Sequence, residues 1–451
     1  MCLGAAVRTR GLDNSKINIV TLGCSKNLVD SEVLLSQLKA SRKKVVHEED
    51  RSNAGTVVIN TCGFIDNAKQ ESIQTILDYV EKKRRGKVRK VYVSGCLSQR
   101  YREELEAQIE GVDGFFGTTD TDLPRILDTL GADYKQELIG ERETATGNHF
   151  AYLKVSEGCN RGCSFCAIPL MRGKHRSRDI EFLVKEASYL AERGTKEIIL
   201  IAQELSSYGV DLDGKKQLNE LLLRLSDVPG IEWIRLHYMY PSGFPLDILP
   251  TMRERENICN YMDMPIQHIS SNVLKIMRRA INRDRTEDLI ARIREEVPGI
   301  AMRTTLLVGH PGETEEDHAE LMDFLESTRL DRVGVFQYSH EENTHAHTLE
   351  DDVPEEVKQK HFEEVMILQQ QISLENNKGR VGKILKTLID TKEDGLFVGR
   401  TEYDSPEVDN MVKISGSGLR FGDFVDVRIT EAEPYDLVGE VVGDQGQVAR
   451  P

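Results

Sequence analysis

Long apolar runs are missing from this sequence. No segment of its 451 residues approaches the roughly 18 consecutive apolar residues that a membrane span requires. A secretory signal is missing too, because the short apolar patch near the start precedes the basic residues instead of following them. We therefore expect a cytoplasmic protein without a membrane partner.

An excess of positive charge is also missing. The chain has 59 Lys and Arg against 75 Asp and Glu, a formal net charge of −16. A surface that holds nucleic acid needs clustered Lys and Arg to replace the counterions of the phosphates. Nucleic-acid binding is therefore not expected as the main role, and a basic protein is a more natural macromolecular partner.

Internal repeats and low-complexity tracts are absent from a composition that is otherwise ordinary. With 39% hydrophobic and 30% charged residues, the chain resembles an average globular protein. Its length predicts about three domains, at roughly 100–200 residues each.

The first predicted domain covers residues 1–148 and ends in a polar linker. Three β-branched runs alternate here with segments of helical period, and each run ends in or next to a cysteine: INIVTLGC, TVVINTCGF and KVYVSGC. Strands and helices in regular alternation indicate a parallel α/β fold with right-handed crossovers.

The second predicted domain covers residues 149–377. Its candidate strands, again separated by helical segments, are AYLKVSEG, EIILIAQE, WIRLHYMY, NYMDMPI, MRTTLLVG and RVGVFQYS. Six such units suggest a partial (βα)6 barrel of the TIM type, in which the chemistry lies in the loops at the carboxyl ends of the strands. A long charged helix is expected from Pro354 to Asn377.

The third predicted domain covers residues 378–451. Short β segments separated by Gly, Asp and Ser follow one another there: KTLIDTK, LFVGRT, MVKIS and FVDVRIT. This spacing predicts a small antiparallel β-barrel.

Three cysteines share one glycine-containing loop, EGCNRGCSFCAIP. Thiolates at Cys159, Cys163 and Cys166 can converge on one cubic iron–sulfur cluster, because the glycines let the backbone wrap closely. With no fourth cysteine nearby, one iron would keep an open position, as a catalytic zinc does. A zinc ribbon usually needs two C-x2-C pairs, and a redox C-x2-C pair leaves the third cysteine unexplained.

The other cysteines lie far apart in the sequence. Cys24, Cys62 and Cys96 each follow a predicted strand of the first domain and each adjoin a glycine. Neighbouring strands lie about 5 Å apart, so three strand ends can bring these thiols around a second cluster. A single cysteine of this kind is more often a core residue, and this is what we expect of Cys259. Disulfides are not expected in a cytosolic chain of this length.

The C-x3-C-x2-C loop with an aromatic residue before its last cysteine resembles that of the radical S-adenosylmethionine (SAM) superfamily. The resemblance implies that the open iron binds the amino and carboxylate groups of SAM, whose cleavage gives a 5′-deoxyadenosyl radical. It places Phe165 near the adenine, although simple packing explains this residue equally well. Gln203, Glu204 and Arg303, at predicted strand ends, are candidates for SAM contacts or for ordinary loop hydrogen bonds.

The chain from about residue 16 to 442 resembles the methylthiotransferases of that superfamily. The similarity rests on TLGCSKNLVDSE, NTCGFIDNAKQES, SGCLSQRY, EGCNRGCSFCAIPLMRGKHRSR, EIILIAQELSSYG and VGHPGETEEDH. It implies a carboxyl-terminal β domain of the TRAM type and two 4Fe-4S clusters, with the one on Cys24, Cys62 and Cys96 carrying the sulfur to be inserted. It also implies SAM as both methyl donor and radical source, and an electron donor such as flavodoxin or ferredoxin.

Two branches of the methylthiotransferases differ in substrate. One modifies an adenosine of transfer RNA, and the other an aspartate of a small-subunit ribosomal protein. The segments GCSKNLVDSE, SFCAIPLMRGKHRSR and YSHEEN resemble the ribosomal-protein branch. From Arg380 onward, nine Lys and Arg stand against fourteen Asp and Glu, a formal charge of −5 that suits a basic protein better than RNA.

The expected reaction is hydrogen removal from the aspartate β-carbon followed by methylthio transfer to it. A transfer-RNA enzyme with the same machinery is the nearer alternative, and a two-cluster electron-transfer protein is the more distant one. The sequence departs from the usual pattern at His310, where Phe is common, at Ser25, where Pro is frequent, and at Asn343 and His345, where Gly and Pro are usual. None of these departures removes a cluster ligand.

Overall fold

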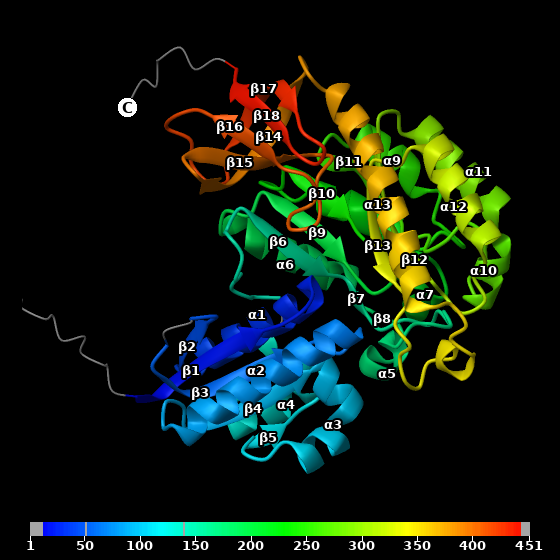
Figure 1. The fold of residues 1–451 in the computed structure, drawn as a ribbon. Helices are drawn as coiled ribbons and strands as arrows, with labels where there is room; N and C mark the ends of the chain where they lie inside the picture. The colour runs from blue at the N-terminus through cyan, green and yellow to red at the C-terminus, as the bar shows by residue number, and fades with distance from the viewer. Residues whose placement is uncertain (1–11, 50–51, 139, 443–451) are drawn as a thin grey trace, which may run out of the picture. The chain divides into compact units, whose positions relative to one another are not determined.

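The computed structural model describes residues 12–49, 52–138 and 140–442. These residues form two compact units (Figure 1). The first contains the described residues up to Ala145 together with Ala167–Gly173, and the second contains Thr146–Cys166 and the described residues from Lys174 onward. The predicted boundaries after residues 148 and 377 stay predictions.

The first unit is built on a parallel five-stranded sheet, as expected. Its order is β2-β1-β3-β4-β5, with the bounds β1 Asp13–Thr21, β2 Lys44–His47, β3 Ala54–Thr61, β4 Lys90–Gly95 and β5 Gly114–Phe115. The three strands predicted from the sequence are β1, β3 and β4. The outer strands β2 and β5 were not expected, because four and two residues are too short to show a period.

Helices cover both faces of this sheet. They are α1 Ser25–Ala40, α2 Asp66–Arg84, α3 Cys96–Gln108 and α4 Thr119–Thr129. Ile19 of β1 packs with Leu38 of α1 and Leu127 of α4 in one apolar cluster. Ile59 of β3 packs with Ile76 of α2 in another. Burial on both faces is typical of a parallel sheet, whose central strands are largely apolar.

The second unit contains a parallel six-stranded sheet in the order β13-β12-β11-β10-β9-β6. The bounds are β6 Phe150–Lys154, β9 Glu197–Ile201, β10 Trp233–Leu236, β11 Ile258–Asp263, β12 Ala301–Val308 and β13 Arg332–Gln337. All six strands coincide with predicted ones, which confirms the partial barrel.

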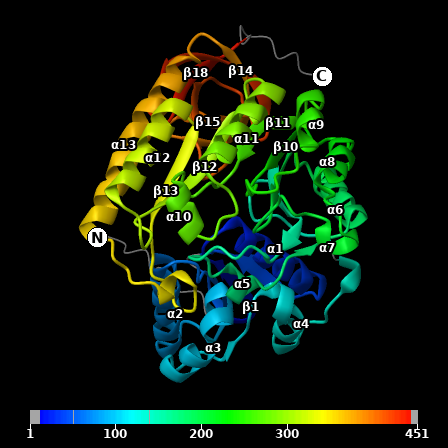
Figure 2. The same cartoon turned by 90° about the vertical axis from the view of Figure 1, so that its right-hand side faces the viewer.

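Helices line the outer face of this sheet (Figure 2). The longer ones are α6 Ile180–Glu192, α8 Leu218–Ser226, α9 Ile248–Glu254, α11 Arg283–Glu296, α12 Glu315–Thr328 and α13 Glu355–Lys378. The helix expected from Pro354 is α13, with Pro354 as its N-cap.

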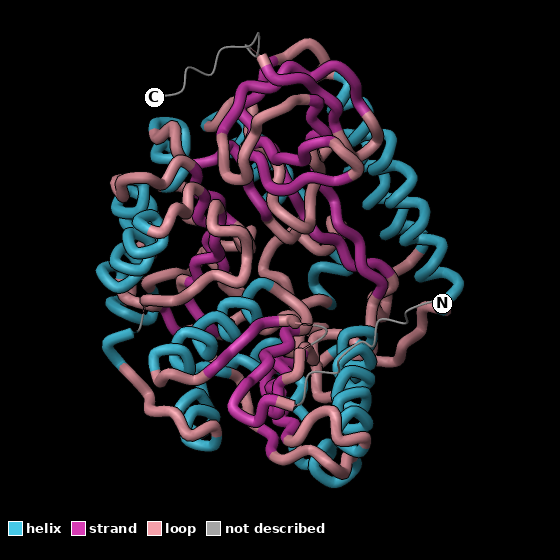
Figure 3. The backbone as a smooth tube through the Cα atoms, turned by 90° about the vertical axis from the view of Figure 1, so that its left-hand side faces the viewer, coloured by secondary structure: helices cyan, strands magenta, loops and turns pink. Residues whose placement is uncertain are grey.

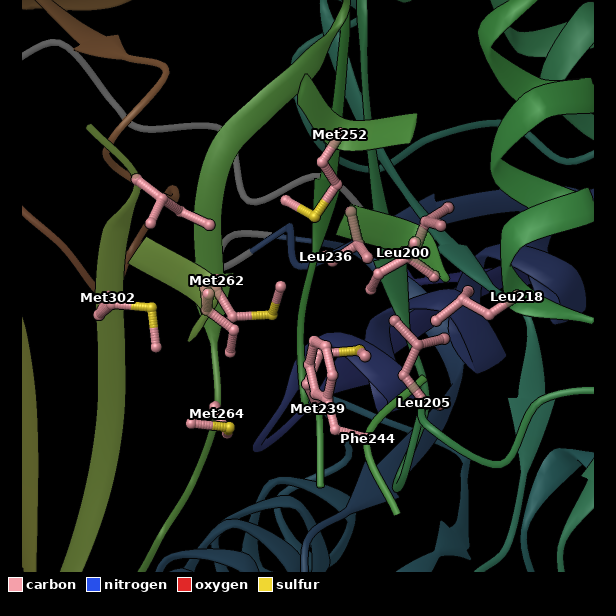
Figure 4. Packing of buried hydrophobic residues seen from close by; sticks show 14 of the residues in the cluster. Leu200, Leu205, Leu218, Leu236, Met239, Phe244, Met252, Met262, Met264 and Met302 are labelled. Atoms are coloured by element: carbon pink, nitrogen blue, oxygen red, sulfur yellow. The ribbon is translucent and has the colours of Figure 1, made fainter. Parts of the chain in front are cut away.

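The main core of the second unit lies between the parallel sheet and its helices. Leu200, Leu236, Met262 and Met302 extend from successive strands into one apolar cluster (Figure 4). Every second strand residue faces this core, so the alternate residues are free to line the inside of the partial barrel.

The carboxyl-terminal strands close into a five-stranded barrel, visible as a ring in Figure 3. Its order is β14-β15-β16-β18-β17, with the bounds β14 Ile384–Glu393, β15 Leu396–Thr401, β16 Val412–Ser415, β17 Phe424–Ala432 and β18 Leu437–Val441. The expectation of an antiparallel barrel needs one correction, because β16 and β18 pair in parallel. The fifth strand, β18, lies beyond the segments recognised in the sequence.

Buried ion pairs join this barrel to the parallel sheet. Arg235 of β10 is fully buried, and its Nε donates to Glu197 Oε1 at 2.8 Å while its Nη1 donates to the carbonyl of Glu402 at 2.7 Å. Arg400 of β15 contacts the other oxygen of Glu197 at 2.7 Å. Residues of the carboxyl-terminal barrel therefore supply hydrogen-bond and ion-pair partners for the charged side chains that are buried inside the parallel sheet.

Within the three described ranges, no helix is both long and apolar enough to cross a membrane. Cys2 lies outside the described residues.

Candidate active site

The three amino-terminal cysteines lie at the carboxyl ends of adjacent parallel strands. Cys24 follows β1 and precedes α1, Cys62 follows β3, and Cys96 follows β4 as the first residue of α3. Strand pairing aligns Thr21 with Asn60 and Thr61 with Gly95, so the three strands end at the same edge. The structure thus brings the predicted residues together where ligands collect in open parallel sheets.

Glycines allow the three cysteine loops to approach one another closely. A Cβ on Gly23 would lie 2.8 Å from the Sγ of Cys62, and one on Gly63 would lie 2.7 Å from the Cα of Leu97. Gly95 has φ +98°, and a Cβ there would meet the carbonyl oxygen of Thr61 at 2.5 Å. The glycine beside each cysteine in the sequence is therefore required by packing.

Two of these thiols are buried and one is exposed. Cys62 and Cys96 are 8% and 7% exposed, whereas Cys24 is exposed. Burial raises the pKa of Cys96 to about 12, and the nearby Arg172 opposes this increase. Burial also raises the pKa of Cys62.

The second set of cysteines lies in the excursion between β7 (Ser156–Glu157) and β8 (Arg176–Ser177). These two short strands pair in antiparallel fashion and close the base of the excursion directly after β6. Cys159 is buried, while Cys163 and Cys166 are partly exposed. Burial raises the pKa of Cys159 to about 11. The backbone N–H of Arg161 donates to the Sγ of Cys159 at 3.4 Å, and this hydrogen bond opposes the increase in pKa.

The cysteine loop is held by the loops that follow other strands of the sheet. The backbone N–H of Ser164 donates to the carbonyl of Met277 at 2.9 Å, and its carbonyl accepts from the N–H of Ala346 at 2.7 Å. The Ser164 hydroxyl lies 3.0 Å from Nε2 of His310. The unusual histidine of VGHPGET therefore anchors the cysteine loop, a polar role that the usual phenylalanine could not fill.

Positive charge surrounds the central cysteine of this loop. Nη1 of Arg279 donates to the Sγ of Cys163 at 3.7 Å, and the Tyr240 hydroxyl lies 3.8 Å from the same sulfur. The guanidinium groups of Arg161 and Arg279 lie 4.2 and 4.4 Å from the centre of the Tyr240 ring. Sequence reasoning missed Tyr240 and Arg279, because neither adjoins a cysteine and only the fold brings them there.

Gln203 and Glu204 follow β9, as expected for residues at the active edge. Nε2 of Gln203 donates to Oε1 of Glu157, and Oε2 of Glu204 accepts from Nε of Arg161 at 3.3 Å. Oε1 of each side chain is buried without a hydrogen-bond partner within the described structure. Two buried, unpartnered acceptors beside a cysteine loop are suited to a ligand that carries hydrogen-bond donors.

Phe165 is half-buried in a small apolar cluster. It packs there with Met277, Leu307 and Tyr338, and its ring lies edge-on to His310 with the centroids 6.3 Å apart. Packing therefore accounts for part of its surface.

The predicted position of Arg303 at the active edge is wrong. Arg303 is the third residue of β12, which continues for five further residues to Val308. Its Nη1 contacts Asp263 at 2.8 Å and its Nε contacts Asp409 of the carboxyl-terminal barrel at 3.3 Å. The sequence pattern located the strand, but the ion pairs inside the sheet determine what the arginine contacts.

Two further departures from the usual family pattern lie in the loop after β13. Asn343 has φ +62°, a conformation that suits the glycine usual at this position and that asparagine tolerates better than most residues. His345 is exposed. Neither change disturbs the hydrogen bond from Ala346 to the cysteine loop.

The donor sets fit two iron–sulfur clusters, each with three protein ligands. Each set has three thiols, and the remaining cysteine of the described chain, Cys259, is buried beside Trp233 and Tyr261 in a separate apolar cluster. Thiolates are the usual protein ligands of such clusters, and a missing fourth ligand leaves an iron open.

Three known families match successive parts of the chain. Residues 16–117 match the family described as "Uncharacterized protein family UPF0004". Residues 153–325 match "Radical SAM superfamily", and residues 381–442 match "TRAM domain".

Solved structures share the fold at low sequence identity. A radical SAM methyltransferase, TsrM from Kitasatospora setae, superimposes with a TM-score of 0.53 at 15% identity, covering 71% of this chain and 73% of that one. The cobalamin-dependent SAM radical enzyme OxsB gives a TM-score of 0.52 at 13% identity, over 77% of this chain and 56% of that one. These similarities concern the fold alone.

Curated relatives match over the whole length. Proteins named "Ribosomal protein uS12 methylthiotransferase RimO" are 56% identical over 97% of this chain in Cytophaga hutchinsonii, with all of the relative covered, and 57% identical over 96% in Flavobacterium psychrophilum, again with all of the relative covered. The Bacteroides thetaiotaomicron protein is 49% identical over 96% of this chain and 99% of its own length. The chain belongs to the RimO family of radical SAM methylthiotransferases.

Proposed function

We propose that this chain transfers a methylthio group to the β-carbon of an aspartate in ribosomal protein uS12. One observation carries the proposal. Two sets of three cysteines lie at the carboxyl ends of two parallel sheets, in a chain that matches curated relatives of that name along almost its full length. The acidic carboxyl-terminal barrel is compatible with a basic protein substrate.

In this proposal Cys159, Cys163 and Cys166 hold the radical cluster, and a second set holds the sulfur-carrying cluster: Cys24, Cys62 and Cys96. When bound, the clusters and SAM supply the radical, the sulfur and the methyl group. Six thiols give up their protons when the clusters bind, because cysteine binds iron as the thiolate and not as the thiol. The amino ends of α1 and α3, next to Cys24 and Cys96, favour negative charge there.

The residues around Cys159 are suited to binding SAM. The unpartnered Oε1 atoms of Gln203 and Glu204 can accept hydrogen bonds from its amino group. Phe165 is half-buried, so part of its ring is free to meet the adenine. Arg303 is left out of this set, because two carboxylates already bind its guanidinium.

The remaining partners follow from this chemistry. Reductive cleavage of SAM requires an electron donor, for which a flavodoxin or a ferredoxin is suitable. A ribosomal-protein substrate implies action in the cytoplasm. In this proposal the predicted domain 1–148 carries the sulfur, the domain 149–377 forms the radical, and the domain 378–451 binds the substrate.

Metal content tests the two-cluster assignment. The wild-type protein reconstituted without oxygen should contain about eight irons, and a variant with Ala at Cys159, Cys163 and Cys166 should contain about four, given one 4Fe-4S cluster per set. The matched variant Cys259→Ala should keep all eight. A wild-type protein with four irons or with zinc would contradict the proposal.

Mass spectrometry tests the substrate. Deletion of the gene should remove a methylthio group from one aspartate of uS12 and leave total transfer RNA unchanged. An unchanged uS12 combined with a lost adenosine modification would instead identify the transfer-RNA enzyme. An electron-transfer protein would cause neither change, and its reduced form would not cleave SAM.

A further inference from the structure

An arginine from outside the amino-terminal sheet reaches its cysteines. Arg172 ends the short helix α5 (Ile168–Arg172), which belongs to the first compact unit although its sequence follows the cysteine loop of the second. Its Nε donates to the Sγ of Cys96 at 3.2 Å. Its Nη1 donates to Oδ2 of Asp30 at 2.6 Å, and its Nη2 donates to Oδ1 of Asn27 at 2.5 Å.

Arg172 and its hydrogen-bond partners are buried. Arg172, Asp30 and Asn27 are 5%, 2% and 0% exposed. Met171, the neighbour of Arg172 in α5, packs in an apolar cluster with Cys96. A buried charge of this kind is retained only when its partners are well placed, so the guanidinium has a fixed position beside the sulfur.

Asn27 connects this arginine to all three strand ends. Its side-chain amide donates to the carbonyl of Leu22 at 2.7 Å, ahead of Cys24, and to the carbonyl of Thr61 at 3.1 Å, ahead of Cys62. Its Oδ1 lies 3.7 Å from the Sγ of Cys96 and accepts from Arg172. Arg172 therefore acts on the geometry of the whole cysteine set as well as on one sulfur.

We propose that Arg172 is a positioning residue of the amino-terminal cluster that raises its reduction potential and stabilises its anionic sulfur. This inference rests on the proposed function, since it requires a cluster on Cys24, Cys62 and Cys96. Hydrogen bonds to the sulfurs and the net local charge are two of the factors that set the potential of such clusters. Reduction adds negative charge to the cluster. The guanidinium of Arg172, whose Nε lies 3.2 Å from the Sγ of Cys96, favours this added charge, because little water screens the interaction at a buried site.

Two substitutions should shift the potential in opposite directions. Arg172→Gln removes the positive charge and leaves Asp30 negative beside the cluster, so reduction becomes harder. Asp30→Asn keeps the guanidinium and removes the carboxylate that neutralises it, so reduction becomes easier. A merely structural role of the arginine predicts no fall of the potential in Arg172→Gln, so this fall is the part of the pattern that reports on the charge of Arg172.

The test uses the full-length chain with Ala at Cys159, Cys163 and Cys166, so that only the amino-terminal cluster contributes. Its midpoint potential is followed by electron paramagnetic resonance during redox titration, together with iron content. We expect Arg172→Gln to lower the reduced-to-oxidised ratio at a fixed potential at least tenfold, about 59 mV for one electron. Asp30→Asn should raise this ratio. The control Arg102→Gln, which breaks the pair with Asp122 elsewhere in the same unit, should leave the potential unchanged.

The outcomes separate the inference from the proposed function. If the parent protein holds about four irons and neither variant shifts the midpoint, the role of Arg172 is refuted while the cluster stands. A parent protein without iron refutes the second cluster itself. If Arg172→Gln fails to fold, the sign of the Asp30→Asn shift decides, and a shift to lower potential overturns the inference.

Discussion

At the scale of single residues, the backbone beside the thiols matters as much as the thiols themselves. Gly95 precedes Cys96 with φ +98°, and a Cβ at this position would lie 2.4 Å from Oδ1 of Asn60. With its ψ of −164°, this is an extended conformation of positive φ that essentially only glycine adopts, and it costs an ordinary residue roughly 1–3 kcal/mol. The overlap adds to that cost, because Asn60 is itself fixed by a hydrogen bond to the carbonyl of Asn27.

Gly95→Ala should therefore destabilise the protein by at least ~2 kcal/mol and lower the iron content of the amino-terminal site. Urea unfolding and iron analysis measure the two effects. The matched control is Gly86→Ala, where φ is +69° but no heavy atom lies within 4 Å of the added Cβ. Equal effects of the two substitutions would show that the close approach of the loops is unimportant.

At the scale of elements, the loop after β11 packs on the start of α12 through polar groups. The Ser270 hydroxyl donates to Asp317, which completes the capping box of α12 with Thr314. His268 of the same loop is fully buried, and its Nδ1 accepts from the N–H of Ser270 at 3.0 Å. Burial lowers the pKa of His268 to about 4, against the opposing effects of Glu313 and Asp317.

This shift makes stability depend on pH. Between about pH 6.5 and 4 the unfolded chain binds a proton at His268 that the folded chain does not. The free energy of unfolding should therefore fall as the pH falls through this window, by ~3 kcal/mol from this residue. Denaturant unfolding at several pH values measures the loss.

His268→Asn provides the comparison, because its side-chain oxygen can accept the same backbone hydrogen bond without titrating. The variant should lose less stability than the wild type between pH 7 and 4. The exposed His340→Gln should follow the wild type. If the curves of wild type and His268→Asn run parallel, His268 is not the source of the pH dependence.

At the scale of the whole molecule, the carboxyl-terminal barrel is part of the second unit and not an appendage. Three arginines inside the parallel sheet depend on it: Arg235 on the carbonyl of Glu402, Arg303 on Asp409, and Arg332 on Asp404 at 2.7 Å. A chain that ends before this barrel would remove the Asp404 carboxylate from Arg332 and one of the partners of Arg235 and of Arg303, which is unfavourable for buried charges.

Arg235→Met should consequently cost ~3–5 kcal/mol of unfolding free energy, because the pairs around Glu197 are buried. Arg253→Met, which breaks an exposed pair with Glu296, should cost under ~1 kcal/mol. Urea unfolding monitored together with limited proteolysis should show the barrel and the parallel sheet unfolding in one transition. Release of the barrel before the sheet unfolds would contradict this coupling.

Much of the fold and the cysteine sites could be predicted because their signals are local. Strand and helix periods located the nine main parallel strands, and the position of each cysteine after a strand indicated which thiols would meet. The short strands β2, β5 and β18 were missed, since their few residues show no period and depend on pairing with neighbours.

The sequence by itself determined the element order, the two cysteine sets and, through its similarity, the family. Only the tertiary structure decided which charges meet. The sequence pattern placed Arg303 at a strand end, as a candidate for a SAM contact or an ordinary hydrogen bond, but it lies within β12 and pairs with Asp263 and Asp409. Arg172, which the sequence did not single out, donates to the Sγ of Cys96. The physical reason is that helix and strand propensities act over a few residues, but a buried charge takes its partner from wherever the fold supplies one.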